Sequence, residues 1–195
     1  CKLFGYIADT KEELEEIAAQ YEPKQVDVSI CVDDTLTKGI ESWGWYGLQP
    51  LNAVTKPGGT LIITSNNSSD ELVKHMHRRD TPFNLSIIKS EPSFAGLFVY
   101  KDDGTDARCL GTALKACPEI CSMASLEAAI RENVGGDEHV ETARASYEDA
   151  RSDEIKAGEG NTETPFTFEI LGWKDMRLGV VIDSVGGHNK YGDSD

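Results

Sequence analysis

The sequence has no long apolar run and no excess of basic residues. Its apolar stretches fall well short of the roughly 18 consecutive residues that a transmembrane helix needs. Lys and Arg number 19 while Asp and Glu number 34, so the formal net charge is −15. Such a charge repels nucleic-acid phosphates and anionic lipid surfaces. We therefore expect neither nucleic acid nor a membrane as partner, and ordinary solubility or a basic protein partner would each account for the acidity.

The sequence also lacks the common nucleotide-binding loops and catalytic sets. It contains neither Gly-x-Gly-x-x-Gly after a strand nor a phosphate loop ending in Gly-Lys-Ser/Thr, and Gly58-Gly59 is better explained as a turn into a strand. No Ser-His-Asp or Cys-His arrangement can be assembled. His75 and His77 lie two apart on an expected helix and therefore point to different faces. We predict no catalytic, cofactor-binding or metal-binding residues in this chain.

The cysteines do not follow a disulfide or metal-binding pattern. Five cysteines are an odd number in a chain too large to need a disulfide framework, which favours reduced thiols in the cytoplasm. Cys109, Cys117 and Cys121 have C-x7-C and C-x3-C spacings, unlike the C-x2-C runs of zinc and iron–sulfur sites, so we expect core thiols. The sequence begins with Cys1 instead of Met. A lipidated N-terminal cysteine would explain this, but a processed or truncated chain is the simpler explanation.

The predicted elements alternate in a way that is typical of an α/β fold. Thr10, Ser68 or Ser69, and Ser122 are suitable N-caps. The β-branched run at 60–64 is typical of a strand buried in a parallel sheet. We predict helices at 10–20, 70–79, 106–117, 123–134 and 138–156, a helical turn at 51–54, strands at 26–32, 60–64 and 84–89, and either state at 94–100.

The composition changes after the last predicted helix. Residues 158–165 are polar and glycine-rich, which indicates a linker. Short strand-like runs follow at 166–170 and 179–182, and the last residues have no core pattern. We expect an extended tail there.

Several motifs follow one another in a recognisable order. Before the linker these are the strand at 26–32, Lys56-Pro57-Gly58-Gly59 leading into a strand, Leu110-Gly111-Thr112-Ala113-Leu114, and Ser125-Leu126-Glu127-Ala128-Ala129-Ile130-Arg131-Glu132. After the linker they are Gly172-Trp173-Lys174-Asp175-Met176, Leu178-Gly179 and Lys190-Tyr191. This succession resembles the γ region, followed by the opening of the δ region, of thiamine-diphosphate 2-oxoacid:ferredoxin oxidoreductases. Arg177 departs from it, because the δ opening often has Pro at that position.

The resemblance implies a division of the chain. It places a Rossmann-like, three-layer γ-type domain at 1–157 with its N-terminal part missing, a linker at 158–165, and the start of a ferredoxin-like δ region at 166–195. The glycine-rich opening of γ and the clustered cysteines of δ are not in this sequence. The resemblance therefore implies that this chain binds no cofactor by itself.

The resemblance also implies a function within a complex of the EC 1.2.7 class. In this family thiamine diphosphate, Mg and substrate belong to α and β partner subunits, electrons leave through [4Fe-4S] clusters to ferredoxin, and γ mainly packs the assembly. The expected role is that of an accessory, non-catalytic subunit in the oxidative decarboxylation of oxalate or pyruvate. Overall likeness slightly favours oxalate, and the use of coenzyme A stays open.

Two other functions fit parts of the sequence. The run Lys56 to Ile63 also resembles a late strand of class I methyltransferases, which use S-adenosylmethionine, but the glycine-rich cofactor loop of that class is not in this sequence. A free-standing binding module is the other alternative.

Aromatic residues mark the expected interface, since such side chains are common anchors between subunits. They gather in a broken segment at 39–50 and after the linker. Core or isolated surface positions would explain them equally. The candidates are Trp43, Trp45, Tyr46, Trp173, Lys174 and Tyr191.

Overall fold

A sheet of parallel strands with one antiparallel edge forms the centre of the protein. The computed structural model describes residues 3–19, 23–32, 34, 42–43, 47–48, 51–89 and 104–160. Within these residues the main sheet has the order β1-β4-β5-β6. Neighbouring strands β1, β4 and β5 are parallel, whereas β6 is antiparallel to β5. The strands are β1 (Val26–Cys31), β4 (Thr55–Thr64), β5 (Phe83–Ile88) and β6 (Ser152–Ile155).

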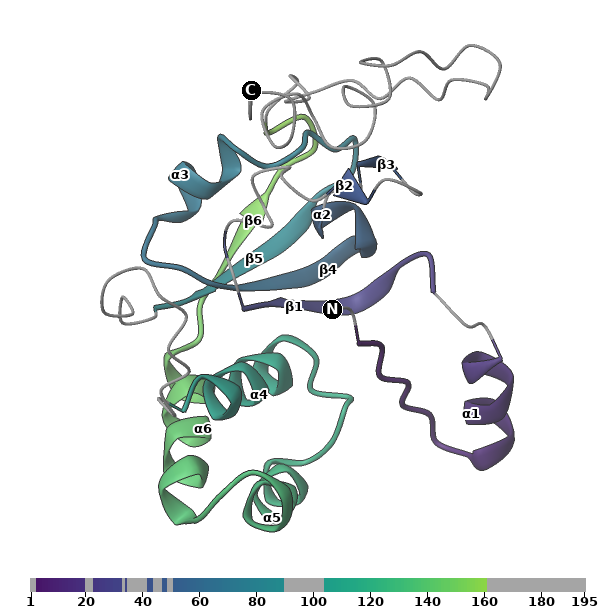
Figure 1. Ribbon diagram of the computed structural model, residues 1–195, viewed down its shortest axis with the longest axis vertical. Helices are drawn as coiled ribbons and strands as arrows, with labels where there is room; N and C mark the ends of the chain where they lie inside the picture. The colour runs from purple at the N-terminus through teal and green to yellow at the C-terminus, as the bar shows by residue number, and fades with distance from the viewer. Residues whose placement is uncertain are drawn as a thin grey trace, which may run out of the picture.

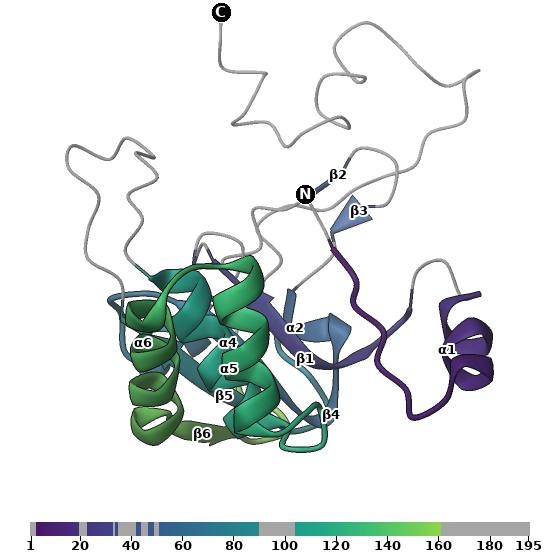
Figure 2. The ribbon, with the colours of Figure 1, turned by 90° about the horizontal axis from the view of Figure 1, so that it is seen from below.

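Helices cover both faces of this sheet, which confirms the predicted α/β fold and its layers. Helix α3 lies on one side of the sheet, while α4, α5 and α6 form a group on the other side (Figure 1). The same grouping of the three helices is visible from below (Figure 2). The helices are α1 (Lys11–Ala18), α2 (Leu51–Val54), α3 (Ser69–Val73), α4 (Thr105–Ala116), α5 (Met123–Asn133) and α6 (Asp137–Asp149).

Strand β4 is the centre of the hydrophobic core. Leu61 and Ile63 pack in one cluster with Leu72 of α3, whereas Ile62 packs in another with Cys109 of α4. Successive side chains of a strand point to opposite faces, so an apolar run is needed where both faces are covered. The β-branched run at 60–64 therefore correctly predicted a buried strand.

Serine and threonine side chains cap the helices as predicted. The Thr10 hydroxyl accepts a hydrogen bond from the backbone N–H of Glu13, and Ser122 accepts one from that of Ser125. Ser68 and Glu71 form a reciprocal capping box at the start of α3. These bonds satisfy amide groups that have no partner inside the helix, and they explain where these helices begin.

The predicted helix at 70–79 is wrong beyond Val73. The backbone amides of His75 and Met76 turn back onto the carbonyl of Leu72, and α3 ends there. His75 and His77 consequently lie after the helix rather than on it.

Arg79 is a buried arginine rather than the exposed end of a helix. Its guanidinium donates hydrogen bonds to the Asn52 carbonyl oxygen and to Thr81 Oγ1, and it lies 5.2 Å from the centroid of the Phe83 ring. Burial lowers the pKa of this guanidinium. Asn52 in turn donates to the carbonyl of His77 at 2.6 Å. These contacts bury the Arg79 side chain. A helix that continued from α3 to residue 79 would not place it there.

The predicted helix at 138–156 is also too long, because α6 ends at Asp149 and residues 152–155 form β6. Ile155 is buried and paired with Phe83, and the hydroxyl groups of Ser152 and Ser86 share a 2.6 Å hydrogen bond. Burial of Ile155 and pairing with β5 outweigh the weak helical preference of these residues.

The predicted turn at Lys56 to Gly59 is an irregularity inside β4. Val26 pairs with Thr55 but Val28 pairs with Thr60, so the register shifts across this segment. Gly58 has a φ of +75°, which favours glycine. Its amide donates to the Pro82 carbonyl at 2.9 Å. The segment is thus held against the neighbouring strand β5.

Residues 158–160 of the predicted linker are packed against the domain. The Gly158 amide donates to the Arg79 carbonyl at 2.8 Å, and Gly158 has a φ of +88°. Residues 161–165 and the δ-like region at 166–195 lie outside the described residues.

The hydroxyl group of Thr64 leads to a stability prediction. Thr64 is buried, and its Oγ1 has no hydrogen-bond partner in the part of the chain that the structure describes. Because an unpaired buried hydroxyl costs about 1–3 kcal/mol, we expect Thr64→Val to raise the free energy of unfolding by about 1 kcal/mol. Chemical denaturation measures this value.

Thr55→Val is the matched control on the same strand. The Thr55 hydroxyl shares a 2.9 Å hydrogen bond with Ser29, and both residues are buried. This variant leaves Ser29 unpaired and should lose about 1–3 kcal/mol. If Thr64→Val lost as much stability as Thr55→Val, the Thr64 hydroxyl would have to make a stabilising hydrogen bond, which would contradict the structure.

Candidate functional site

The predicted interface residues are described only in part. Trp43 lies in β2 (Ser42–Trp43), which pairs antiparallel with β3 (Gly47–Leu48) through a Trp43–Gly47 pair. The structure describes the backbone of Trp43 and not its side chain. The other candidates lie outside the described residues, and these are Trp45, Tyr46, Trp173, Lys174 and Tyr191. Their role at an interface stays a prediction.

A polar cluster lies where β1 and β4 end, at the carboxyl edge of the parallel strands. Asp34 Oδ2 accepts hydrogen bonds from Ser65 Oγ at 2.6 Å and from Asn67 Nδ2 at 3.1 Å. The Asn67 backbone amide donates to Ser65 Oγ at 3.0 Å. The sequence predicts a strand at 26–32 and no binding site after it. Asp34 follows β1, and Ser65 and Asn67 follow β4. Polar residues after two parallel strands could have predicted this cluster, because the carboxyl ends of such strands meet at one edge of the sheet.

The contacts of Asp34 are those of a structural carboxylate. Ser65 is buried, and its own amide donates to the Ile88 carbonyl at 3.0 Å, so the cluster connects β1, β4 and β5. Within the described ranges no three His, Cys, Asp or Glu residues are placed to hold a metal ion. The hydrogen bonds of the cluster connect the ends of these strands.

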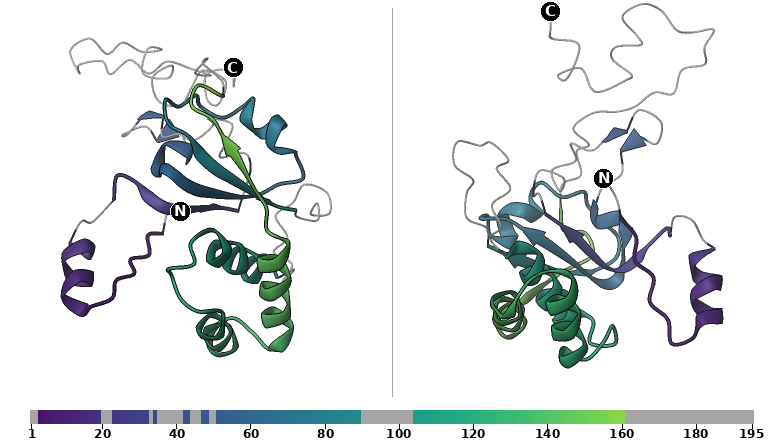
Figure 3. Two further views of the ribbon diagram at one scale, coloured as in Figure 1. Left: turned by 180° about the vertical axis from the view of Figure 1, so that it is seen from behind. Right: turned by 60° about the horizontal axis from the view of Figure 1, so that its bottom comes forward.

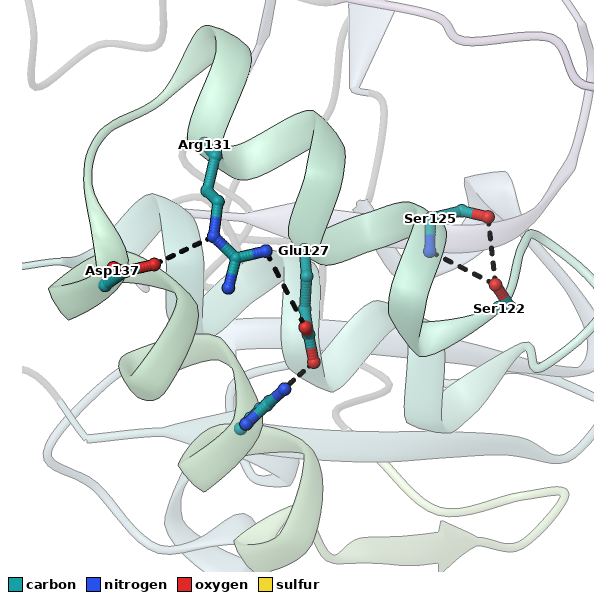
Figure 4. A network of polar contacts seen from close by, with 6 residues as sticks. Ser122, Ser125, Glu127, Arg131 and Asp137 are labelled. Carbon is teal, nitrogen blue, oxygen red and sulfur yellow. Dashed lines mark hydrogen bonds and ion pairs between the residues drawn. The ribbon is translucent and has the colours of Figure 1, made fainter.

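A second polar network joins α5 to α6 (Figure 4). Glu127 of α5 is buried, and its Oε1 accepts a hydrogen bond from Nε of Arg144 on α6. Arg131, one turn after Glu127, lies 3.8 Å from Glu127 Oε2. Its Nε also donates to Asp137 Oδ1 at 2.8 Å. One carboxylate thus connects two helices through two arginines.

The Glu127 carboxylate is charged and fully engaged. The hydrogen bond from Arg144 holds the pKa of Glu127 below its usual range, and the charges of Arg144 and Arg131 add to this effect. The side chain borders an open hollow of about 430 Å³, which is lined by Met123, Glu127, Arg144, Tyr147 and Glu148. A general acid needs a proton to give, so this carboxylate is a poor general acid, and its contacts connect α5 to α6.

The pKa of Glu127 predicts how stability depends on pH. Its folded pKa is depressed, so the stability that it contributes is present above the usual carboxyl pKa of about 4.3 and is lost as pH falls through the folded pKa. Glu127→Gln should therefore lower stability at neutral pH and flatten the loss in acid. Unfolding free energies measured between about pH 7 and pH 3 test this.

Glu132→Gln is the control, because it removes one negative charge from an exposed position on α5. If it changed the pH profile as much as Glu127→Gln, net charge rather than the arginine pairs would be the cause.

The cysteines do not form a reactive site in the described part of the chain. Cys109 is buried, as expected for a core thiol, and Cys31 is buried too, whereas Cys117 and Cys121 are only half-buried. Burial raises the pKa of the Cys117 thiol, which donates to Glu119 Oε2 at 3.3 Å. A nucleophilic cysteine needs a lowered pKa, so Cys117 is not a good candidate.

Comparison with solved structures shows distant structural similarity. The chain is similar to the PORC subunit of pyruvate oxidoreductase (EC 1.2.7.1) from Thermotoga maritima, with 14% sequence identity and a TM-score of 0.43. The match covers 66% of this chain and 66% of that subunit. No protein-family model and no curated protein matches the sequence. At this identity and TM-score the likeness does not establish a shared function.

No helix of the described residues is long and apolar enough to cross a membrane.

Proposed function

We propose that this chain is an accessory, non-catalytic subunit of a 2-oxoacid:ferredoxin oxidoreductase complex. The complex would decarboxylate oxalate or pyruvate oxidatively and pass the electrons to ferredoxin. Thiamine diphosphate, Mg and [4Fe-4S] clusters would be held by other parts of the complex. Subunits of the α and β type are the proposed partners.

The observation that supports the proposal is the order of the γ-like motifs along one continuous fold. They occupy β1, the irregular start of β4, the middle of α4 and most of α5. Strands β1 and β4 are neighbours, and α4 packs on β4 through Ile62. Helix α5 contributes to the cluster that α4 and α6 share. The motifs thus belong to one packed unit rather than to scattered segments.

The two polar networks support an accessory rather than a catalytic role. The carboxylate of Glu127 is paired with arginines, and that of Asp34 is hydrogen-bonded to Ser65 and Asn67. Both networks connect elements of the fold. The lowered pKa of Glu127 makes this carboxylate a poor general acid.

Purification from the native host tests the proposal. The chain would be tagged in the genome and isolated under gentle, low-salt conditions, with the untagged strain as control. We expect α- and β-type oxidoreductase subunits to copurify in a fixed ratio to the chain. A monomeric chain, or a stable assembly without such subunits, would overturn the proposal.

A further inference from the structure

Residues 77–82, which lie between α3 and β5, contact two segments that are distant in the sequence. The His77 carbonyl accepts a hydrogen bond from Asn52 Nδ2 at 2.6 Å, and the Arg79 carbonyl accepts one from the Gly158 amide at 2.8 Å. The yellow-green end of the described chain accordingly lies beside the connection that follows α3 (Figure 3, left). We call residues 77–82 the connecting segment.

Arg79 takes part in the contacts on both sides of the connecting segment. Its carbonyl binds Gly158, while its guanidinium donates to the Asn52 carbonyl oxygen and to Thr81 Oγ1. No other Lys or Arg of the described residues is buried. A buried charged group that loses its hydrogen bonds carries a large desolvation penalty. A movement of Arg79 that released Gly158 would therefore also disturb the bonds to Asn52.

The turn at 156–160 fits closely against the connecting segment because two of its residues are glycines. Gly158 has a φ of +88° and Gly160 a φ of +115°, which favour glycine. A Cβ atom at Gly160 would lie 2.9 Å from the Met76 carbonyl oxygen and 3.0 Å from the Arg78 Cα. The backbone of the turn thus packs directly on residues 76–78.

The two segments that the connecting segment contacts adjoin the regions with the predicted interface residues. Helix α2 begins at Leu51, after the segment 39–50, and the turn at 156–160 precedes residues 161–195. We propose that the connecting segment couples α2 to this turn, so that both are held or released together. A partner that holds one region would thereby stabilise the attachment of the other. The coupling goes beyond the proposed function and does not depend on it, because it is a property of the chain alone.

Coupled and independent contacts have different consequences for local opening. If the contacts of Asn52 and Gly158 open independently, a substitution at one affects only its own surroundings, and the effects of two substitutions add. If they are coupled through Arg79, each substitution also loosens the distant contact by a reciprocal amount.

Amide hydrogen exchange of the full chain, followed by NMR, tests the coupling from the side of α2. In Asn52→Ala the Gly158 amide should exchange about tenfold faster, roughly the effect of losing one hydrogen bond. Asn133→Ala is the matched control, because Asn133 Nδ2 also donates to a backbone carbonyl, that of Ala129 at 3.0 Å, but on α5. It should change the exchange of Gly158 by less than about twofold.

Gly160→Ala tests the coupling from the side of the turn. The Cβ atom displaces the turn from Met76, and we expect the amides of α2 to exchange about tenfold faster. Gly136→Ala is the control, since a Cβ there would meet no atom within 4 Å. The amides of residues 61–63 in the core of β4 should keep their exchange rates in both variants.

The double variant Asn52→Ala/Gly160→Ala completes the test. Under coupling, Gly158 and α2 should exchange no more than about twofold faster in the double variant than in the faster single variant. Effects confined to the substituted side, effects that multiply in the double variant, or equal acceleration at 61–63 would overturn the coupling. These outcomes are independent of which proteins copurify with the chain, so the coupling and the proposed function can fail separately.

Discussion

Gly111→Ala is expected to destabilise the domain, although the same change stabilises most helices. A Cβ atom at Gly111 would lie 2.1 Å from the Ala143 carbonyl oxygen, because the backbones of α4 and α6 lie close together there. Alanine in a helix gains about 1 kcal/mol over glycine, but forcing backbone atoms apart in a packed core costs about 1–3 kcal/mol or more. We expect a net loss of about 2 kcal/mol, with backbone contact as the cause.

Chemical denaturation measures this loss, and Gly5→Ala is the control. A Cβ at Gly5 would meet no atom within 4 Å, so that variant should change the free energy of unfolding by less than about 0.5 kcal/mol. If Gly111→Ala were as stable as the unmodified protein, α4 and α6 could not be packed as described.

Ile62→Ala is expected to have the largest effect of any single substitution discussed for this protein. Ile62 is fully buried on the central strand, where it packs with Ile88, Cys109 and Ala113. Truncation of such a side chain to alanine costs about 2–5 kcal/mol, since it loses apolar burial and leaves a cavity. This is a large fraction of the total stability of a typical domain, about 5–15 kcal/mol.

Ile62→Val provides a graded comparison. It removes one methylene group and should cost about 0.5–1.5 kcal/mol. Denaturation curves of the two variants should differ in midpoint in this order. A loss of less than about 1 kcal/mol for Ile62→Ala would mean that the contact between the sheet and α4 is not formed as described.

The sequence predicts the elements of this fold well where local signals and packing agree. Thr10, Ser68 and Ser122 cap helices, and the run at 60–64 is the central strand. The predictions failed where long-range contacts determine the secondary structure. The contacts of Arg79 stop α3 early, and pairing with β5 turns residues 152–155 into a strand.

The polar networks also combine contacts that local sequence predicts with contacts that depend on the folded structure. Glu127 and Arg131 are four residues apart on a helix, and a salt bridge between them can be predicted from that spacing. Arg144 reaches Glu127 from another helix, so only the folded structure reveals the pair. Asp34 and Ser65 are joined by the parallel pairing of β1 and β4, which a sequence pattern indicates without giving the contact.

The exposure of residues in α1 and β1 could be anticipated only in part. The acidic sequence of α1 is evident from the chain itself. That Ile30 is exposed while Ile62 is buried depends on their places in the sheet, which alternation along a strand does not reveal. Whether an apolar strand residue is exposed thus depends on the position of its strand in the sheet.

The most direct test of the proposed function is an activity measurement on the assembly isolated through this chain. The assembly would be supplied with oxalate or pyruvate, with and without coenzyme A, and reduction of ferredoxin would be followed by its absorbance. We predict ferredoxin reduction that depends on the 2-oxoacid and on thiamine diphosphate, in fractions where the chain is present in a fixed ratio to its partners. Activity that separates completely from the chain during purification would contradict the account.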